Sequence, residues 1–430
     1  MRPFLPSRRT ALAATLSAIT ATGWPLAAMA QARRWSIAGA ASTGSSGWDN
    51  PYNVLGETAV QELAAAALDG PLTRADVDRR LSGTGITVQN LIATDVLRRL
   101  PNGRYALAFN VVPREDKLLA RSVADGAGAS LAAAFLAEQA AFGAAFARYD
   151  LPHVDRGVLA MALVGCVVLD WDGLGVTASD GWRASPQRKP NGDVFQMTMS
   201  EISPDVSVRA LYWGSHNTAT EDGATVLSTF GDHEAPNRLG FPDVTSRVST
   251  NDMQAYAPSD VARALANALN SGMRAQQDEV GRIMMRLREG PATPEELGAE
   301  RTTQRLLEGL LYVRNESGRY HAHVPVISAA HDAAMVEEVR AHGRAIMRAW
   351  LGQNYARVRE QLSGLRSVRA GVPYEIVFTQ LWHDLFGWTN YHLVREGFMY
   401  DPYGPDAEWV SFVPFVWEAS LNLWEGTGLF

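Results

Sequence analysis

The sequence predicts an α+β fold in which two similar helical modules flank a central segment that forms an antiparallel sheet. Segments 57–113 and 278–327 share an order of short helices followed by a β run, and residues 156–260 alternate β-like runs with turn residues. The expected parts are an export signal at 1–30, a linker at 31–56, a first module with its long helix at 57–155, an α+β insert at 156–272, a second module with its long helix at 273–365, and an aromatic-rich helix and hairpin region at 366–430.

The first thirty residues predict export. Two adjacent arginines, Arg8 and Arg9, precede the apolar run ALAATLSAIT, and the sequence AMA follows and ends at Ala30. This order is typical of a signal of the twin-arginine type, although Ala11 and Leu12 stand where the usual pattern has Phe-Leu. An ordinary amphipathic helix is the alternative. Cleavage near Ala30 would leave a periplasmic chain of 400 residues.

The composition limits the classes of partner. The chain has 39 basic and 46 acidic residues, and loss of the signal would remove three arginines and no acid, which changes the net charge from −7 to −10. An acidic protein has no general attraction to phosphate backbones, so we expect no nucleic-acid partner. No segment after the signal looks long and apolar enough to cross a bilayer, so we expect a soluble mature chain without a transmembrane segment.

The repeat is visible in the order of elements. The first copy reads as helices over TAVQELAAAALDG, PLTRADVDRRL and ITVQNLIATDVLRRL, followed by the β run NGRYALAFNVVP. The second reads as helices over DEVGRIMMRLREG, PATPEELG and RTTQRLLEGLLYV, followed by ESGRYHAHVPVI. In this alignment Gly70 corresponds to Gly290 and Tyr105 to Tyr320, and both tyrosines are expected to point inward. A long helix follows each copy.

Three helices and a β-wing resemble the winged-helix fold, here present twice. The resemblance covers roughly residues 57–150 and 278–365. Winged helices usually bind nucleic acid, but fold is not function. The stretch that would be the first recognition helix, TVQNLIATDVL, has no basic residue before Arg98, and its second counterpart has only Arg301 and Arg305. DNA binding is therefore the least favoured of the functions considered.

The insert contains the richest polar cluster in the chain. Segments 212–217 and 228–234 are predicted to pair as a hairpin, which would bring Ser215, His216, Asp232 and His233 toward one end of a sheet. Two histidines and a carboxylate can bind a divalent metal, and Ser, His and Asp can form a nucleophilic centre. The alternative is that these are turn residues that cap backbone groups. We place the candidate binding or metal site here.

Residues 167–175, VVLDWDGLG, read as a hydrophobic strand that ends in two carboxylates. The stretch is similar to the nucleophile loop of haloacid-dehalogenase-type phosphatases, in which one aspartate attacks phosphorus. Leu174 stands where that family has Thr, and we favour a turn with two solvated carboxylates, Asp170 and Asp172. Cys166 is the single cysteine, and its apolar surroundings predict a buried structural thiol.

The second β run holds two histidines one residue apart, His321 and His323. Alternation along a strand would point both toward the outward face, where Ala106 and Ala108 stand in the first copy. Two ligands do not make a metal site, and the spacing identifies no third ligand. We therefore expect surface residues here and rank this pair below the cluster around His216.

These patterns predict where the protein is located more clearly than they predict its function. The leading hypothesis is an exported, soluble, non-catalytic protein that binds another protein or a small ligand, because no recognisable catalytic motif appears. The alternative is an exported hydrolase or metal-dependent enzyme with its site around 212–234. The sequence does not identify a cofactor.

Overall fold

The computed structural model describes residues 33–203, 206, 210, 214–232, 235, 238–244, 259–271 and 273–424. The predicted export signal at 1–30 lies outside these residues. Residues Trp35–Phe430 form one compact unit.

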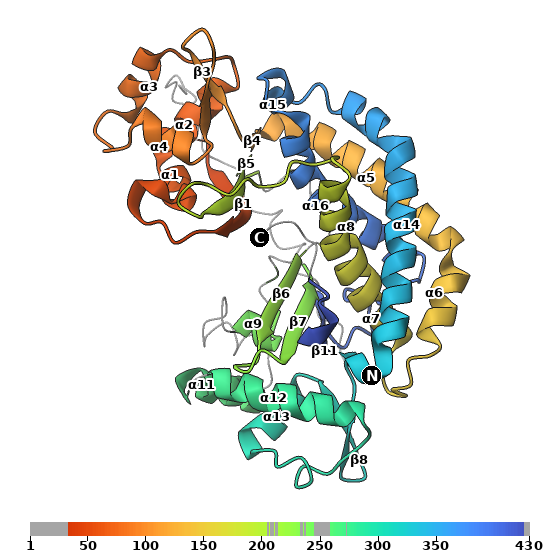
Figure 1. The fold of residues 1–430 in the computed structure, drawn as a ribbon. Helices are drawn as coiled ribbons and strands as arrows, with labels where there is room; N and C mark the ends of the chain where they lie inside the picture. Colours follow the sequence, from red (N-terminus) through yellow and green to blue (C-terminus); the bar gives the residue numbers. More distant parts are fainter. Residues whose placement is uncertain are drawn as a thin grey trace, which may run out of the picture. The chain divides into compact units, whose positions relative to one another are not determined.

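The chain alternates helices and strands along its whole described length, and it belongs to the α+β class as predicted (Figure 1). Its helices are α1 (Pro51–Gly56), α2 (Thr58–Ala67), α3 (Arg74–Leu81), α4 (Val88–Ala93), α5 (Arg114–Ala137), α6 (Gln139–Phe146), α7 (Arg156–Ala160), α8 (Gly173–Ser179), α9 (Phe241–Val244), α11 (Ser259–Ser271), α12 (Met273–Arg288), α13 (Arg301–Gly309), α14 (Ala329–Gln361), α15 (Arg366–Arg369) and α16 (Tyr374–Arg395), with 3₁₀ turns η1 (Gly47–Asp49) and η3 (Ala419–Leu421) and the π-helix η2 (Met161–Asp172).

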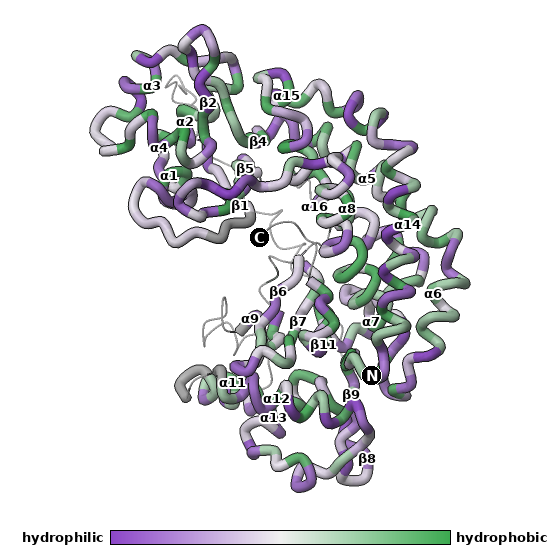
Figure 2. The backbone as a smooth tube through the Cα atoms, viewed as in Figure 1, coloured by the Kyte–Doolittle hydropathy of each residue, from purple (hydrophilic) through white to green (hydrophobic). Residues whose placement is uncertain are grey.

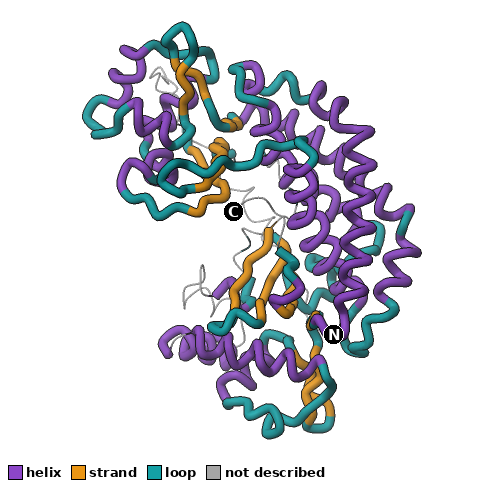
Figure 3. Tube along the Cα trace, in the orientation of Figure 1, coloured by secondary structure: helices purple, strands orange, loops and turns teal. Residues whose placement is uncertain are grey.

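The strands form two main sheets and two separate hairpins (Figure 3). They are β1 (Trp35–Ser42), β2 (Leu97–Arg99), β3 (Tyr105–Leu107), β4 (Asn110–Val112), β5 (Val194–Glu201), β6 (Gly214–Ala219), β7 (Thr225–Gly231), β8 (Val313–Glu316), β9 (Arg319–Ala322), β10 (Val326–Ile327) and β11 (Phe412–Glu418). The first sheet has the order β1-β5-β4 and the second the order β10-β11-β7-β6, and β2-β3 and β8-β9 are the hairpins.

The two sheets are built in the same way. In the first, β4 pairs in parallel with β5, whose other edge pairs antiparallel with β1. In the second, β10 pairs in parallel with β11, whose other edge pairs antiparallel with β7. A single residue separates β4 from α5 and β10 from α14. The repeat therefore extends beyond the predicted modules, to a first half at 35–201 and a second half at 214–418.

The backbone hydrogen bonds of the two modules also correspond. Leu72 and Tyr105 exchange hydrogen bonds of 2.8 and 2.9 Å, and Ala292 and Tyr320 exchange hydrogen bonds of 3.3 and 2.8 Å. Both tyrosines are buried, as the alignment predicts. Each pair ties a hairpin to the segment that follows the first helix of its module.

Three local predictions were wrong. The segment predicted as a linker carries β1 and α1, and it is held because Trp35 and Val54 are buried in the core. The predicted third helix of the first module ends at Ala93, and the rest of its sequence forms β2. Residues 294–298 form turns rather than a helix, although Thr293 and Glu296 make the hydrogen bonds of a capping box. The segment is too short for capping to stabilise a helix.

The central insert does not form a separate sheet, because its strands pair with strands from other parts of the chain. Its strand β5 pairs with β1 and β4, which precede it, and β7 pairs with β11 from the C-terminal region. The predicted antiparallel pairing is present in β1-β5, β6-β7 and β7-β11, but each main sheet also has one parallel pair. The C-terminal segment after α16 supplies a single strand to the second sheet instead of the predicted hairpin.

Each half contributes a long apolar helix to the other. The continuous helix α7-η2-α8 follows the long helices of the first half and packs against α14 of the second. In return, α16 follows α14 and packs against α5. Two glycines allow close approach: a Cβ at Gly128 would lie 2.6 Å from the Cβ of Trp388, and one at Gly343 would lie 2.3 Å from a methyl of Val168.

Helix 156–179 is long and apolar enough to span a membrane, contrary to the expectation from sequence that no such segment follows the signal. However, 94% of its most apolar stretch is buried inside the protein. Figure 2 shows green, the colour of apolar residues, along this segment. The helices α5 and α6 pass the same test only as a pair, and a 60° bend separates them. The burial of 156–179 is that of a core helix.

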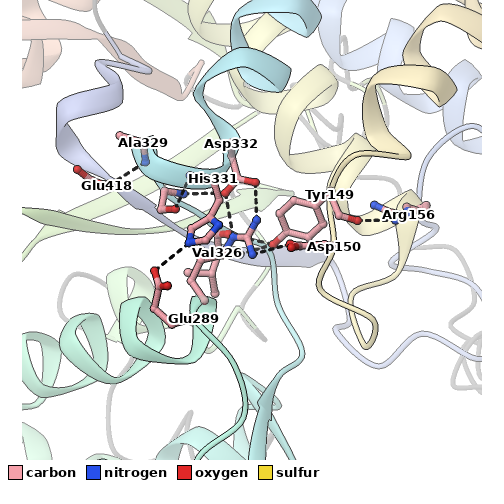
Figure 4. Close-up of polar contacts among 11 residues, drawn as sticks. Tyr149, Asp150, Arg156, Glu289, Val326, Ala329, His331, Asp332 and Glu418 are labelled. Carbon is pink, nitrogen blue, oxygen red and sulfur yellow. Dashed lines mark hydrogen bonds and ion pairs between the residues drawn. The ribbon is translucent and has the colours of Figure 1, made fainter.

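Hydroxyl groups hold the exchanged segments in place. The Ser367 hydroxyl, after α14, donates to the Val111 carbonyl oxygen at 2.6 Å and accepts from the Val111 amide at 2.9 Å. The Tyr149 hydroxyl, after α6, makes the same two bonds to Val326, at 3.0 and 2.8 Å (Figure 4). Val111 and Val326 occupy equivalent positions in β4 and β10. Each half therefore clamps the parallel strand of the other.

Buried charge fixes the start of α14 beside this clamp. Arg288 donates to both carboxylate oxygens of Asp332, at 3.0 and 2.7 Å, and to Asp150 at 2.6 Å. Asp332 also accepts from the amide of Ser328, the N-cap of α14 (Figure 4). Since the ion pair is buried and fully hydrogen-bonded, it fixes geometry more than it adds stability.

The repeat makes a prediction about its two turn glycines. Gly70 and Gly290 have φ of +143° and +139°, a region that residues with a Cβ rarely adopt. We expect Gly70→Ala and Gly290→Ala each to lower the free energy of unfolding by about 1 kcal/mol or more. Chemical denaturation measures the change. The matched control is Gly126→Ala within α5, where a Cβ meets open space and stability should not fall. Equal effects at all three positions would contradict the expectation.

Candidate functional site

The hairpin predicted at 212–217 and 228–234 is present in its described part as β6 and β7. Ser215 lies opposite Phe230 and His216 lies opposite Thr229. Because neighbouring residues of a strand face opposite sides, Ser215 and His216 point to different faces of the second sheet. The predicted pairing of the two strands is confirmed, but the Ser215 and His216 side chains do not converge.

The candidate residues bind different partners. The Ser215 hydroxyl accepts from the Trp171 indole at 3.1 Å, and the His216 Nδ1 contacts the Asp243 carboxylate. Asp232 accepts a hydrogen bond of 2.8 Å from the Tyr403 hydroxyl. His233, the fourth predicted residue, lies outside the described residues. The three described candidates do not form a common metal or nucleophilic centre.

His216 instead belongs to a buried ion network. Arg238 lies 3.2 Å from Asp243 and donates to Thr229 at 2.7 Å and to the Gly214 carbonyl oxygen at 3.1 Å. Burial by itself would raise the pKa of Asp243, but Arg238 and His216 outweigh it and keep the pKa below its ordinary value. The network closes the edge of the second sheet, and no sequence pattern indicated Asp243 or Arg238.

On the other face of β6, the two aspartates predicted to be solvated are both buried. Asp172 receives two hydrogen bonds from Arg340, at 3.0 and 2.7 Å. Burial raises the pKa of Asp170 to about 8, against a smaller opposing effect of its hydrogen bond with Ser215. Burial likewise raises the pKa of the Cys166 thiol, and the predicted burial of this cysteine is confirmed.

Asp170 makes the stability of the protein depend on pH. In the folded chain its carboxyl holds a proton up to about pH 8, whereas the unfolded chain releases it near pH 4. The folded state binds the extra proton in this window, so the contribution to stability falls as pH rises. We expect Asp170→Asn, which cannot ionise, to gain about 2 kcal/mol or more relative to the native chain between about pH 5 and pH 8.

Urea denaturation at each pH measures this gain. The matched control is Asp172→Asn, which removes the carboxylate that accepts both Arg340 hydrogen bonds and should be destabilising at both ends of the range. Parallel pH profiles for Asp170→Asn and the native chain would show that Asp170 ionises without cost.

A cavity of about 430 Å³ lies in the first half, between the first sheet, α5 and α16. Its size is that of a small-molecule site. The lining combines apolar side chains with many polar ones, and the residues are Ser36, Ala38, Asn110, Val112, Lys117, Ala120, Thr198, Ser200, Glu201, Ile202, Ser203, Val206, Leu365, Val377, Gln380, Leu381 and Asp384.

Both signs of charge face this cavity. Lys117 comes from the first turn of α5 and Asp384 from the middle of α16, and both side chains are buried. Asn110 of β4 is also buried, and Glu201 lies at the end of β5. Buried polar groups that converge on an open volume are the usual means by which a protein orients a small ligand.

The equivalent space in the second half is filled. Where Thr198 of β5 faces Ala38 of β1, Phe415 of β11 faces Ser228 of β7. Ser200 corresponds in the same way to Trp417, whose indole donates to Ser228 at 2.8 Å. The corresponding strands thus carry small polar residues in the first half and large aromatic ones in the second.

Trp171 completes the aromatic filling of the second half. This residue of η2 lies with its ring centroid 6.2 Å from that of Phe415 and 5.9 Å from that of Trp417. The position eight residues beyond the parallel strand is Ala120 in the first half and Met335 in the second. At three positions of the repeat, the cavity is thus lined by Ala120, Thr198 and Ser200, where the second half has the larger Met335, Phe415 and Trp417.

Sequence analysis did not identify this site. One signal was available: Lys117 and Lys189 are the only lysines in a chain whose other basic residues are arginine. The aromatic residues of the C-terminal region gave no further help, because Trp382, Trp388 and Trp417 are buried core residues, whereas Trp424 is exposed.

Comparison with protein families, with curated proteins and with solved structures yields no match to this chain.

Proposed function

We propose that this protein is an exported binding protein that holds a small polar molecule in the cavity of its first half. The observation that supports the proposal is the difference between the halves: one packs the position with aromatic side chains and the other leaves about 430 Å³ open beside buried charges. An unfilled apolar cavity would cost stability. A cavity with polar and charged side chains in its lining is instead suited to a ligand that carries polar groups.

The lining indicates the class of ligand. Lys117 offers donors and positive charge, while Asp384 and Glu201 offer acceptors and negative charge. A molecule that carries both kinds of group, such as an amino acid or a short peptide-like compound, fits this set better than a purely apolar one. The sequence agrees with a binding role, because it contains no recognisable catalytic motif.

The fold supports the same proposal at a coarser level. We propose that the two modules are winged-helix-like units that serve here as structural walls. The helices that would enter a DNA groove offer little positive charge. Helix α4 has no basic residue, and α13 has only Arg301 and Arg305. DNA binding remains the least favoured function.

The alternative is an enzyme with its site around 212–234. The contact between His216 and Asp243 favours it, since such pairs orient general bases. Against it, Ser215 faces the other side of the sheet and bonds Trp171. The nucleophile and the base therefore do not meet among the described residues.

The two lysines provide a matched test of the cavity. Lys117→Met should abolish the rise in melting temperature that a bound ligand produces, because the cavity loses its cation. Lys189→Met should leave it unchanged, since Lys189 pairs with Asp95 at 2.5 Å, away from the cavity lining. The measurement is a thermal-shift screen of amino acids, dicarboxylates and sugars, repeated by calorimetry for each compound that binds.

A second variant distinguishes loss of the cavity from loss of charge. Thr198→Phe introduces the side chain that the second half carries at this position and should block binding while the chain still folds. If no compound in the screen shifts the native chain, and native mass spectrometry finds no bound molecule, the binding proposal is wrong.

Export has its own test. Replacing Arg8 and Arg9 together with Lys should leave the precursor in the cytoplasm, because twin-arginine export depends on the guanidinium pair. Cell fractionation with immunoblotting measures the distribution, and a variant with Arg33 replaced by Lys is the control. Periplasmic delivery of the double variant at the native level would contradict the prediction.

A further inference from the structure

Three potential metal ligands meet at the hairpin of the second half. Glu316 lies at the end of β8, His321 in β9 and His153 in the loop that follows α6. One ligand atom from each of the three residues lies within 4.8 Å of the other two, the only such group of His, Cys, Asp and Glu within the described part of the chain. The His153 Nδ1 is 3.4 Å from a Glu316 oxygen, and the two imidazole centroids are 4.5 Å apart.

Backbone structure fixes all three positions. Glu316 and His321 belong to one hairpin, in which Arg314 pairs with His321 and Glu316 with Arg319. The loop that carries His153 is tied to the same hairpin by His323, whose Nδ1 lies 3.0 Å from the His153 carbonyl oxygen.

His323 is buried, contrary to the expectation that both histidines of this stretch lie on the surface. It follows the last residue of β9, and its Nε2 contacts Glu408 at 2.6 Å. His321, two residues earlier in β9, is half-buried. The two histidines therefore have different roles: His323 anchors the loop, and His321 meets the other two ligands.

The first half shows that the fold does not require these ligands. The hairpin position equivalent to His321 is Ala106, and the loop position equivalent to His153, four residues beyond the clamping hydroxyl, is Gly371. The loop that carries Gly371 instead contacts the β2-β3 hairpin through Arg98, which donates to the Gly371 carbonyl oxygen at 2.9 Å. Neither His153 nor His321 therefore has a histidine at its equivalent position in the repeat.

We propose that His153, Glu316 and His321 bind a zinc-type divalent ion. Two imidazoles and a carboxylate suit Zn²⁺ rather than Mg²⁺ or Ca²⁺, which prefer oxygen ligands. Ligand atoms around tetrahedral zinc lie roughly 3.3–3.5 Å apart. The His153–Glu316 distance already matches, and rotation of the partly exposed side chains would bring the third atom in. A fourth position stays open to water or an incoming ligand.

The structure brings further potential ligands to the histidine pair that the sequence ranked second. The cluster around His216 was preferred because several polar groups were expected to meet there, whereas His321 had no visible third ligand. In the structure Ser215, His216 and Asp232 have separate partners. The missing ligands of His321 come from Glu316 and from His153, which is distant in the sequence.

Zinc binding to the full chain tests the proposal. Protein without a histidine tag is treated with chelator, and Zn²⁺ affinity is measured by competition with a chromophoric chelator, with Co²⁺ absorption as a report on ligand geometry. The native chain should bind one ion at this site, and His153→Ala and His321→Ala should each weaken it at least about tenfold. Glu316→Gln keeps the shape, removes the charge and should also weaken binding.

Two histidines outside the cluster provide controls. His331 pairs with Glu289 and His392 with Asp125, each partly exposed beside a carboxylate but in no group of three ligands among the described residues. His331→Ala and His392→Ala should bind zinc as the native chain does, and Lys117→Met should as well, which separates this site from the cavity. Equal zinc affinity in the native chain and in His321→Ala, with both folded by circular dichroism, would overturn the proposal, as would the absence of binding in the native chain.

Discussion

The exchange of long helices between the two halves is the constraint on which the rest of the structure depends. Helix 156–179 packs on α14 and α16 packs on α5, so the apolar face of each half is covered by the other. Gly128 and Gly343 permit this contact, because any side chain there would meet Trp388 or Val168. The hydroxyl clamps of Ser367 and Tyr149 then fix each exchanged segment to the opposite parallel strand. Neither half could bury its core alone.

Burying a complete helix creates an electrostatic cost that the chain meets in two ways. Asp172 is paired with Arg340, which donates two hydrogen bonds to its carboxylate. Asp170, two residues away, keeps its proton instead, and its carboxyl is bonded to Ser215. Transfer of an unpaired carboxylate into such a core is more costly than its protonation. The two solutions orient η2 between α14 and the second sheet.

The proposed sites lie where the two halves differ. The cavity is open because Thr198 and Ser200 stand where the second half has Phe415 and Trp417. The zinc site arises because His321 stands where the first half has Ala106. A duplicated fold can change such positions in one copy without loss of its architecture, since the corresponding hydrogen bonds and helix contacts are kept elsewhere.

The sequence by itself determined the features that depend on local spacing: the α+β class, the inward positions of Tyr105 and Tyr320, the pairing of β6 with β7, and the buried Cys166. Only the tertiary structure decided which distant groups meet. Tyr149 clamps Val326 across 177 residues, and Asp243 rather than Asp232 pairs with His216. His153 reaches His321 because the helix exchange brings its loop to the hairpin. Periodicity reports which face of an element is apolar, but not which partner covers that face.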